Sequence, residues 1–199
     1  MELNEAVRRR HMTRNFSGAP LGRELLDALL TLALRAPSAG NTQGREFVVL
    51  EGPDETDRYW RATTDAGWRA RSRRFAGLSR APVAVLAYGD PDAYVERYRA
   101  PDKARDDGTD VEWVVPYWFV DAAFAVQTLL LAAADRGVGA ALLGNFRGEE
   151  ALRDVLGVPE GRRWLGTVLL GEAAAPDPTS TSAARPGRTL DEAVHRGRW

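Results

Sequence analysis

Apolar residues recur at helical spacing near the start of the chain. The stretch 3–10 places its apolar side chains on one helical face, and 21–35 carries a longer stripe of leucine and alanine. Pro37 follows, and proline ends a helix because it has no N–H to donate and its ring clashes with the preceding turn. The pattern predicts two amphipathic helices followed by a turn.

Short continuous apolar runs bounded by glycine, proline or charge predict four buried strands, at 47–50, 82–88, 138–146 and 167–171. Helical spacing predicts the elements between them: an interrupted helix over 55–75 with Gly67 in its middle, a short helix and a mobile surface loop over 90–110, and helices at 117–136 and 149–156. The chain therefore alternates helices and strands along most of its length.

The predicted helix 117–136 is apolar on nearly every face, and Gly137 suits its C-terminal cap. Asp121 and Gln127 interrupt the apolar run, which argues against a membrane span. We expect protein to cover this helix all round, as the spine of a core or of a subunit interface.

Composition narrows the class of protein. A chain of 199 residues with 44% apolar content can bury one sizeable core, so we expect a single domain over 1–199. Its arm, from about 172 to 199, is extended, because 176–182 is rich in proline, serine and threonine.

The net charge of -1 gives no broad basic surface for nucleic acid. There is no cysteine, two histidines are too few for a zinc site, and 1–10 lacks the apolar core of a signal peptide. We expect a cytoplasmic protein without a metal.

Two short segments carry candidate chemistry. The cationic run 8–16 offers guanidinium groups, which bind phosphate oxygens in a bidentate manner. The turn 36–43 offers small side chains and amide groups to a flat polar ring. Each alone is more typical of a solvated helix face or a helix exit, but their joint occurrence indicates one nucleotide-like cofactor.

Further motifs follow in order across nearly the whole chain. They are Arg10-His11-Met12-Thr13-Arg14-Asn15-Phe16, Ala36-Pro37-Ser38-Ala39-Gly40-Asn41-Thr42-Gln43, Gly137-Val138-Gly139, Gly144-Asn145-Phe146, and the pair Arg185 and Arg188. In this order the motifs resemble the FMN-dependent nitroreductase family. The resemblance implies an α+β fold, a nitroreductase-like α/β sandwich with a small mixed, mostly antiparallel sheet flanked by helices, in an intertwined homodimer that exchanges its terminal arms.

The resemblance also implies a set of residues that bind FMN. By position, the residues that would bind the phosphate are Arg10, Arg14, Arg185 and Arg188, with His11 and Met12 in the same segment. The residues that would contact the edge of the flavin ring are Pro37, Ser38, Ala39 and Asn41, with Gln43 as a second amide. The backbone near Leu143, Gly144 and Asn145 faces flavin N5. The family usually supplies the turn from one subunit to a flavin held largely by the other.

Three positions depart from the family pattern. Met12 stands where serine is common, and the neighbouring Thr13 is the candidate to supply the missing hydroxyl. Gly44-Arg45 replaces a frequent proline-tryptophan, which alters how the following strand packs. Gly144-Asn145 replaces glutamate-glycine, so only a backbone role carries over there.

The function implied is that of an FMN-dependent oxidoreductase of the nitroreductase type. It would transfer hydride by a ping-pong scheme from NAD(P)H, its co-substrate, through the flavin to a small electron-poor acceptor such as a nitroarene, quinone or enone. Two alternatives stay open: a specialised flavin dehydrogenase or oxidase acting on a natural product or deazaflavin precursor, and a flavin-binding carrier or sensor without efficient turnover.

Two aromatic segments have two interpretations each. The stretch 68–74 is either a solvated basic helix, which we favour, or a site for an anionic donor or substrate. Trp113, Tyr117, Trp118 and Phe119 either line a substrate cavity or pack in a core or interface.

Overall fold

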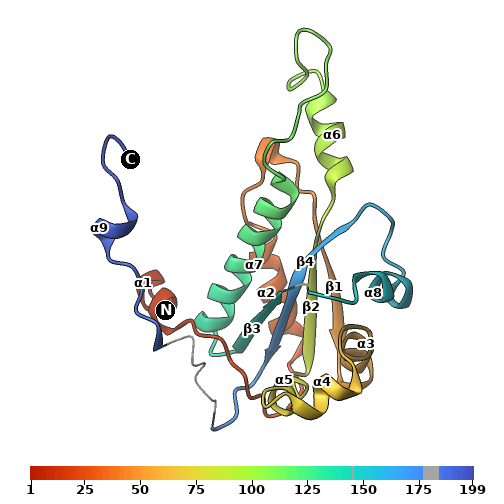
Figure 1. Cartoon of the computed structure of the whole chain (residues 1–199), viewed down its shortest axis with the longest axis vertical. Coiled ribbons are helices and arrows are strands. Elements are labelled where there is room, and N and C mark those ends of the chain that lie inside the picture. The colour runs from red at the N-terminus through yellow and green to blue at the C-terminus, as the bar shows by residue number, and fades with distance from the viewer. Residues whose placement is uncertain (145, 177–183) are drawn as a thin grey trace.

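The computed structural model describes residues 1–144, 146–176 and 184–199. At its centre lies a four-stranded sheet in the order β1-β2-β4-β3 (Figure 1), formed by Arg45–Glu51 (β1), Val83–Gly89 (β2), Gly139–Gly144 (β3) and Arg163–Gly171 (β4). The predicted α+β sandwich is confirmed. All pairings among the described strands are antiparallel, so a parallel strand, which a mixed sheet would need, is not among them.

The strand β2 shows how the two halves of the core arise. Successive side chains of a strand point to opposite faces of the sheet. Val83 and Val85 pack in one apolar cluster with α2 and α7, whereas Leu86 and Tyr88 pack in a second cluster on the other face. Both faces of the sheet are therefore covered, which explains why every residue of this strand is buried.

The first face is covered by helices α2 (Arg23–Ala33) and α7 (Tyr117–Asp135), and α1 (Leu3–Arg9) packs against α7. By length and composition α7 could cross a membrane, and it is the single such helix in the described ranges. Here it is a core helix lying across the sheet. Phe124 is nevertheless 48% exposed. Within one chain this helix is therefore not covered all round, and its coverage by a second subunit stays a prediction.

The second face is covered by α3 (Pro53–Thr63), α4 (Ala66–Arg71), α5 (Phe75–Leu78) and α8 (Glu149–Leu156). The predicted interruption of 55–75 is confirmed, but the first break comes before Gly67. Asp65 causes this break because its carboxylate accepts the backbone N–H of Trp68, at 2.6 Å, and so begins a new helix.

Three elements complete the chain: the single turn η1 (Ala39–Asn41), α6 (Pro91–Arg99) and α9 (Leu190–Ala193). Helix α9 was not predicted, and the predicted fourth strand begins at Thr167, four residues after the observed start of β4. Residues 184–199 are all exposed, and α9 stands apart from the sheet (Figure 1). The proposed extended segment 176–182 lies almost wholly outside the described residues.

Candidate cofactor site

The segment after α1 runs between the free edge of β3 and helix α5. Thr13 donates its backbone N–H to the Ala140 carbonyl at 2.8 Å, and Phe16 donates to the Gly77 carbonyl at 3.2 Å. Close packing fixes this path, because a Cβ on Gly77 would lie 2.4 Å from the Arg14 carbonyl oxygen. The cationic run is therefore held against the sheet by its backbone.

Alternate side chains of this segment face opposite ways. Met12 and Arg14 are half-buried; the Met12 sulfur accepts the Leu142 N–H at 3.3 Å, and the Arg14 guanidinium donates to the Met12 carbonyl at 2.7 Å. Thr13 instead points into the core, with none of its surface exposed, against Gly139. Thr13 also lines a small cavity beside Arg10 and His11, so its replacement of the missing serine hydroxyl stays a prediction.

Arg10 and His11 lie farther along the same edge. With Gly139 and Ala140 of β3, and with Leu130 and Ala134 of α7, they line a small cavity of about 140 Å³. His11 is exposed, and its Nδ1 lies 3.0 Å from the Arg9 carbonyl oxygen. The structure thus places the segment from Arg10 to Arg14 along β3, and its role in binding FMN stays a prediction.

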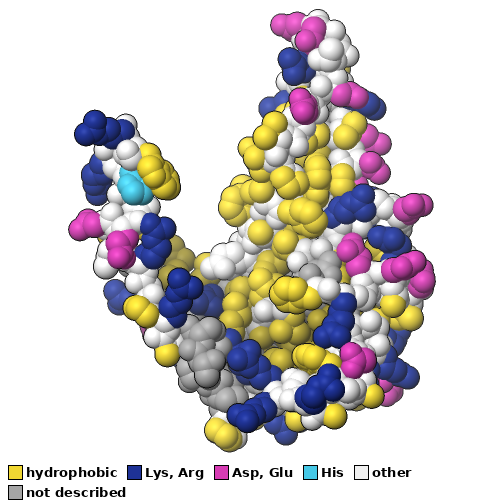
Figure 2. Space-filling view, viewed as in Figure 1, with side chains coloured by type: hydrophobic (Ala, Val, Ile, Leu, Met, Phe, Trp, Pro, Cys, Tyr) yellow, Lys and Arg dark blue, Asp and Glu magenta, His cyan; other side chains and the backbone are white. Residues whose placement is uncertain are grey.

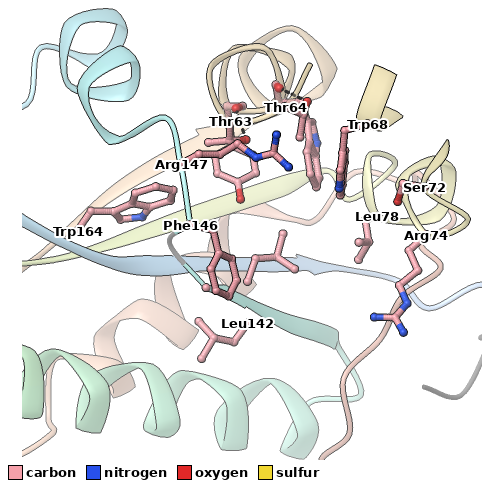
Figure 3. Close-up of a pocket in the computed structure, with 14 residues that line it drawn as sticks. Thr63, Thr64, Trp68, Ser72, Arg74, Leu78, Leu142, Phe146, Arg147 and Trp164 are labelled. Carbon is pink, nitrogen blue, oxygen red and sulfur yellow. Dashed lines mark hydrogen bonds between the residues drawn. The ribbon is translucent and has the colours of Figure 1, made fainter. Parts of the chain in front are cut away.

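A larger cavity of about 460 Å³ opens where β3 ends (Figure 3). Leu143 and Gly144 form part of its wall; Asn145, their predicted partner, lies outside the described residues. Figure 3 shows Leu142 and Phe146 on one side, with Thr63, Thr64 and Trp68 on the other. The remaining residues that line it are Tyr59, Trp60, Ser72, Arg74, Leu78, Arg147 and Trp164. Such a wall, mostly aromatic and aliphatic with a few polar groups, suits a flat aromatic ligand.

The charge of this cavity is positive. Arg74 and Arg147 line it, and the lining residues include no carboxylate. Asp65 lies behind the wall, 3.0 Å from the Arg147 guanidinium. The N–H of Trp68 and the Arg147 charge lower the pKa of Asp65. Burial raises the pKa of Tyr59, so its phenol is neutral at physiological pH. The cavity therefore offers aromatic surface and cations to a ligand.

The polar turn 37–43 is a separate, tightly bonded unit. Ser38 Oγ accepts the Gln43 N–H at 3.0 Å, and the Ala39 N–H donates to the Asp121 carboxylate at 2.8 Å. Pro37, Asn41 and Gln43 are exposed, whereas Ser38 and Ala39 are half-buried. Arg45, which stands where the family often has tryptophan, is buried and donates to the Leu34 carbonyl. The turn therefore presents its two amide side chains to the outside.

A single chain does not bring this turn to the cationic segment. The turn is fixed at Asp121, near the start of α7, whereas Arg10 and His11 lie beside Leu130 and Ala134 near its end. A helix rises about 1.5 Å per residue, so Asp121 and Ala134 are about 20 Å apart along its axis. Nor do the described contacts join Arg185 or Arg188 to the segment; both are exposed on the arm.

Most residues of the cavity wall were not assigned to a site from the sequence. We favoured a solvated basic helix for 68–74. Arg71 and Arg73 are indeed exposed, but Trp68 and Arg74 of the same stretch line the cavity. Tyr59 and Trp60 were not singled out. In the sequence they form an aromatic pair on a helix followed by basic residues. That pattern does not show that the helix lies over the end of β3.

The second aromatic segment packs on itself. Trp113 makes edge-to-face contacts with Tyr94, Tyr98, Tyr117 and Trp118, at centroid distances from 4.8 to 6.4 Å. These rings do not line the large cavity of their own chain. Within the described ranges, no cluster of three histidine or carboxylate side chains is placed to hold a metal ion.

Comparison with known proteins agrees with this geometry. The model of the Nitroreductase family matches residues 7–172, and the chain therefore belongs to that family, whose members are oxidoreductases. A protein of Archaeoglobus fulgidus, provisionally named an NADH dehydrogenase/NAD(P)H nitroreductase, is 27% identical over 96% of this chain and 94% of its own length.

Solved structures show the same fold. Nitroreductase CinD from Lactococcus lactis, in complex with nicotinic acid, has a TM-score of 0.72 at 20% identity, covering 94% of this chain and all of its own. A nitroreductase family protein from Clostridium difficile 630 has a TM-score of 0.71 at 18% identity and matches both chains over their whole length.

Proposed function

We propose that this protein is a cytoplasmic FMN-dependent oxidoreductase, one domain with an arm from about residue 172, which carries electrons from NAD(P)H to a small electron-poor acceptor such as a nitroarene, quinone or enone. The observation that carries the proposal is the adjacency of the Arg10 to Arg14 segment to a cationic, aromatic cavity at the end of β3. FMN, when bound, supplies hydride acceptance and donation at the ring.

The residues of the site fit FMN in two ways. A phosphate carries about -1.5 to -2 charges, and guanidinium groups bind its oxygens through paired N–H donors. Arg10 and Arg14 supply such donors beside β3. The cavity of about 460 Å³ adjoins the same segment at Leu142, whose N–H donates to the Met12 sulfur, and it has flat aromatic walls and room for a ring. Leu143 and Gly144 would bring backbone to the ring, and glycine permits a close approach there.

A second copy of the chain completes the site in this proposal. Arg10 and the turn 37–43 lie at opposite ends of α7, so one chain cannot offer both to one ligand. Figure 2 shows an apolar surface over α7 and β3, open toward the arm, and Phe124 and Leu142 are exposed. Such a surface is typical of subunit contacts. In a homodimer, Ser38, Asn41 and Gln43 of one protomer would reach the cavity of its partner, and an exchanged arm would bring Arg185 and Arg188 to the phosphate.

The chain's own groups would then bind, orient and shield. Arg10 and Arg14 hold the phosphate, the backbone at Gly144 fixes the ring edge, and the aromatic wall excludes water from the reacting face. The structure of CinD with nicotinic acid supports a donor with a pyridine ring. Among the described residues that line the large cavity there is neither histidine nor carboxylate.

The test is retention of FMN by Arg14→Ala, with Arg23→Ala as the matched control. Arg23 is exposed and pairs with Glu51 at 3.2 Å, away from β3. Because a charge-assisted hydrogen bond is worth about 1.5 to 3 kcal/mol, Arg14→Ala should weaken FMN binding by about tenfold to a hundredfold. Arg23→Ala should bind as the wild type does. Equal binding by both variants would remove Arg14 from the site.

A second experiment separates the catalytic alternatives. The purified protein is mixed with NADPH or NADH without oxygen, and the flavin absorbance near its visible maximum is followed. Rapid bleaching supports the reductase. A flavin that stays yellow with both donors supports a carrier, a sensor or a specialised dehydrogenase instead.

A further inference from the structure

The turn 37–43 has a backbone conformation that is uncommon for residues other than glycine. Asn41 has φ +53° and Gln43 has φ +58°, and they are the non-glycine residues with positive φ in the described ranges. Such conformations cost about 1 to 3 kcal/mol each and persist only when the surroundings hold them. Hydrogen bonds within the turn, such as that from the Gln43 N–H to Ser38 Oγ, contribute to holding it, and groups outside the turn add to them.

Asp121 is the group that holds the turn from below. Its side chain lies in the core, 2% exposed, and one oxygen, Oδ2, accepts both the Ala39 N–H at 2.8 Å and the Tyr94 hydroxyl at 2.5 Å. A buried carboxylate needs donors, since leaving it unpaired costs several kcal/mol. Burial and the neighbouring Asp121 raise the pKa of Tyr94, so this phenol stays protonated and donates.

Helix α6 holds the turn from the other side. Arg97 Nε donates to the Gly40 carbonyl at 2.8 Å, and the Tyr98 ring packs so closely on Gly40 that a Cβ there would lie 2.9 Å from it. The turn is thus bonded to α7 through Asp121 and to α6 through Arg97. Tyr94 links the two helices, because it lies on α6 and donates to Asp121 on α7.

We propose that Asp121, oriented by Tyr94, is a positioning residue that sets the shape of the turn and so places Asn41 and Gln43 against the cofactor of the partner protomer. The role in cofactor binding rests on the proposed function. Asp121 itself would not touch the cofactor; it acts through the Ala39 N–H, two residues before Asn41. A charge-assisted hydrogen bond suits this task because it is short and strong.

The test uses two readouts on the full-length protein. The first is hydrogen exchange of the backbone amides over 38–43, which reports the shape of the turn without any cofactor. The second is the FMN dissociation constant, measured by titrating apoprotein and following the quenching of flavin fluorescence. The variants are Asp121→Ala, Asp121→Asn and Tyr94→Phe. The matched control is Tyr88→Phe, which also alters a buried tyrosine but packs in the cluster on the other face of the sheet.

Asp121→Ala should speed exchange of the Ala39 amide by about tenfold and raise the FMN dissociation constant by a similar factor. Asp121→Asn keeps an acceptor oxygen and should restore most of both values. Tyr94→Phe should raise the exchange rate of the Ala39 amide and the FMN dissociation constant by about threefold each while the protein stays folded. If Asp121→Ala does not fold, Tyr94→Phe alone tests the proposal. Tyr88→Phe should leave both unchanged.

Unchanged exchange in Asp121→Ala and Tyr94→Phe would overturn the positioning role. Faster exchange with an unchanged dissociation constant would overturn its link to the cofactor. A wild-type protein that binds no FMN, while Asp121→Ala still loosens the turn, would refute the proposed function and leave Asp121 as the residue that shapes the turn.

Discussion

The substitution Gly77→Ala probes how closely the cationic segment must lie against α5. The new Cβ would stand 2.4 Å from the Arg14 carbonyl oxygen and 3.1 Å from the Asn15 Cα. Both neighbours are backbone atoms, so no flexible side chain can swing away. Since Cβ atoms essentially never lie within 3.0 Å of another heavy atom, the segment must retreat by at least about 0.6 Å.

The size of the effect follows from this displacement. Forcing one methyl group into a packed contact costs about 1 to 3 kcal/mol of stability. Moving a binding group by a large fraction of an ångström costs up to about a hundredfold in function. We therefore expect Gly77→Ala to fold, to unfold a few degrees earlier, and to bind FMN about tenfold to a hundredfold more weakly.

The assay compares FMN titration of apoprotein with thermal unfolding, and Gly22→Ala is the control. Gly22 has φ -62°, and a Cβ there meets nothing within 4 Å. The Gly22→Ala variant should bind FMN as the wild type does. If Gly77→Ala loses stability but binds FMN with wild-type affinity, the position of Arg14 does not set cofactor affinity.

Two further predictions concern the dimer and the core. Phe124→Arg places a charge on the exposed face of α7, so sedimentation should show a monomer, and FMN retention should fall with it; an intact dimer would contradict the proposed interface. Burial raises the pKa of Tyr88 to about 12. Folding thus favours the neutral phenol, and its contribution to stability is complete below pH 10 and lost as the pH rises toward 12. Urea unfolding across this range should show a smaller loss in Tyr88→Phe, and an equal loss would place the titrating group elsewhere.

Local patterns in the sequence predicted most of the elements. Glu149–Leu156 was predicted with its observed bounds, because Gly157 ends it in a left-handed conformation and Pro159 follows. Arg163–Gly171 was predicted too short, because Gly166 separates Trp164 and Leu165 from the apolar run although Trp164 is 3% exposed. Helix α9 could have been found from its capping box, Thr189 with Glu192.

The site was predictable only where its residues are contiguous. The segment from Arg10 to Arg14 could be recognised from its charges, but its place along β3 was not predicted. The inward direction of Thr13 depends on its pairing with Ala140, which no local pattern reveals. Tyr59 and Arg74 reach the cavity because α3, α4 and α5 cover one face of the sheet, and that packing joins residues far apart in the sequence.

The central claim, that two copies build each cofactor site, can be tested with mixed dimers. One chain carries Arg14→Ala and the other carries Asn41→Ala with Gln43→Ala, and different affinity tags isolate the mixed particle. If the cationic segment with Arg14 and the turn with Asn41 and Gln43 come from different copies, the mixed dimer has one intact site and one site altered in both parts. Because the two sites of a twofold dimer are equivalent, it should retain about half of the wild-type FMN, well above either parent dimer. Retention no better than that of the parents would contradict the claim.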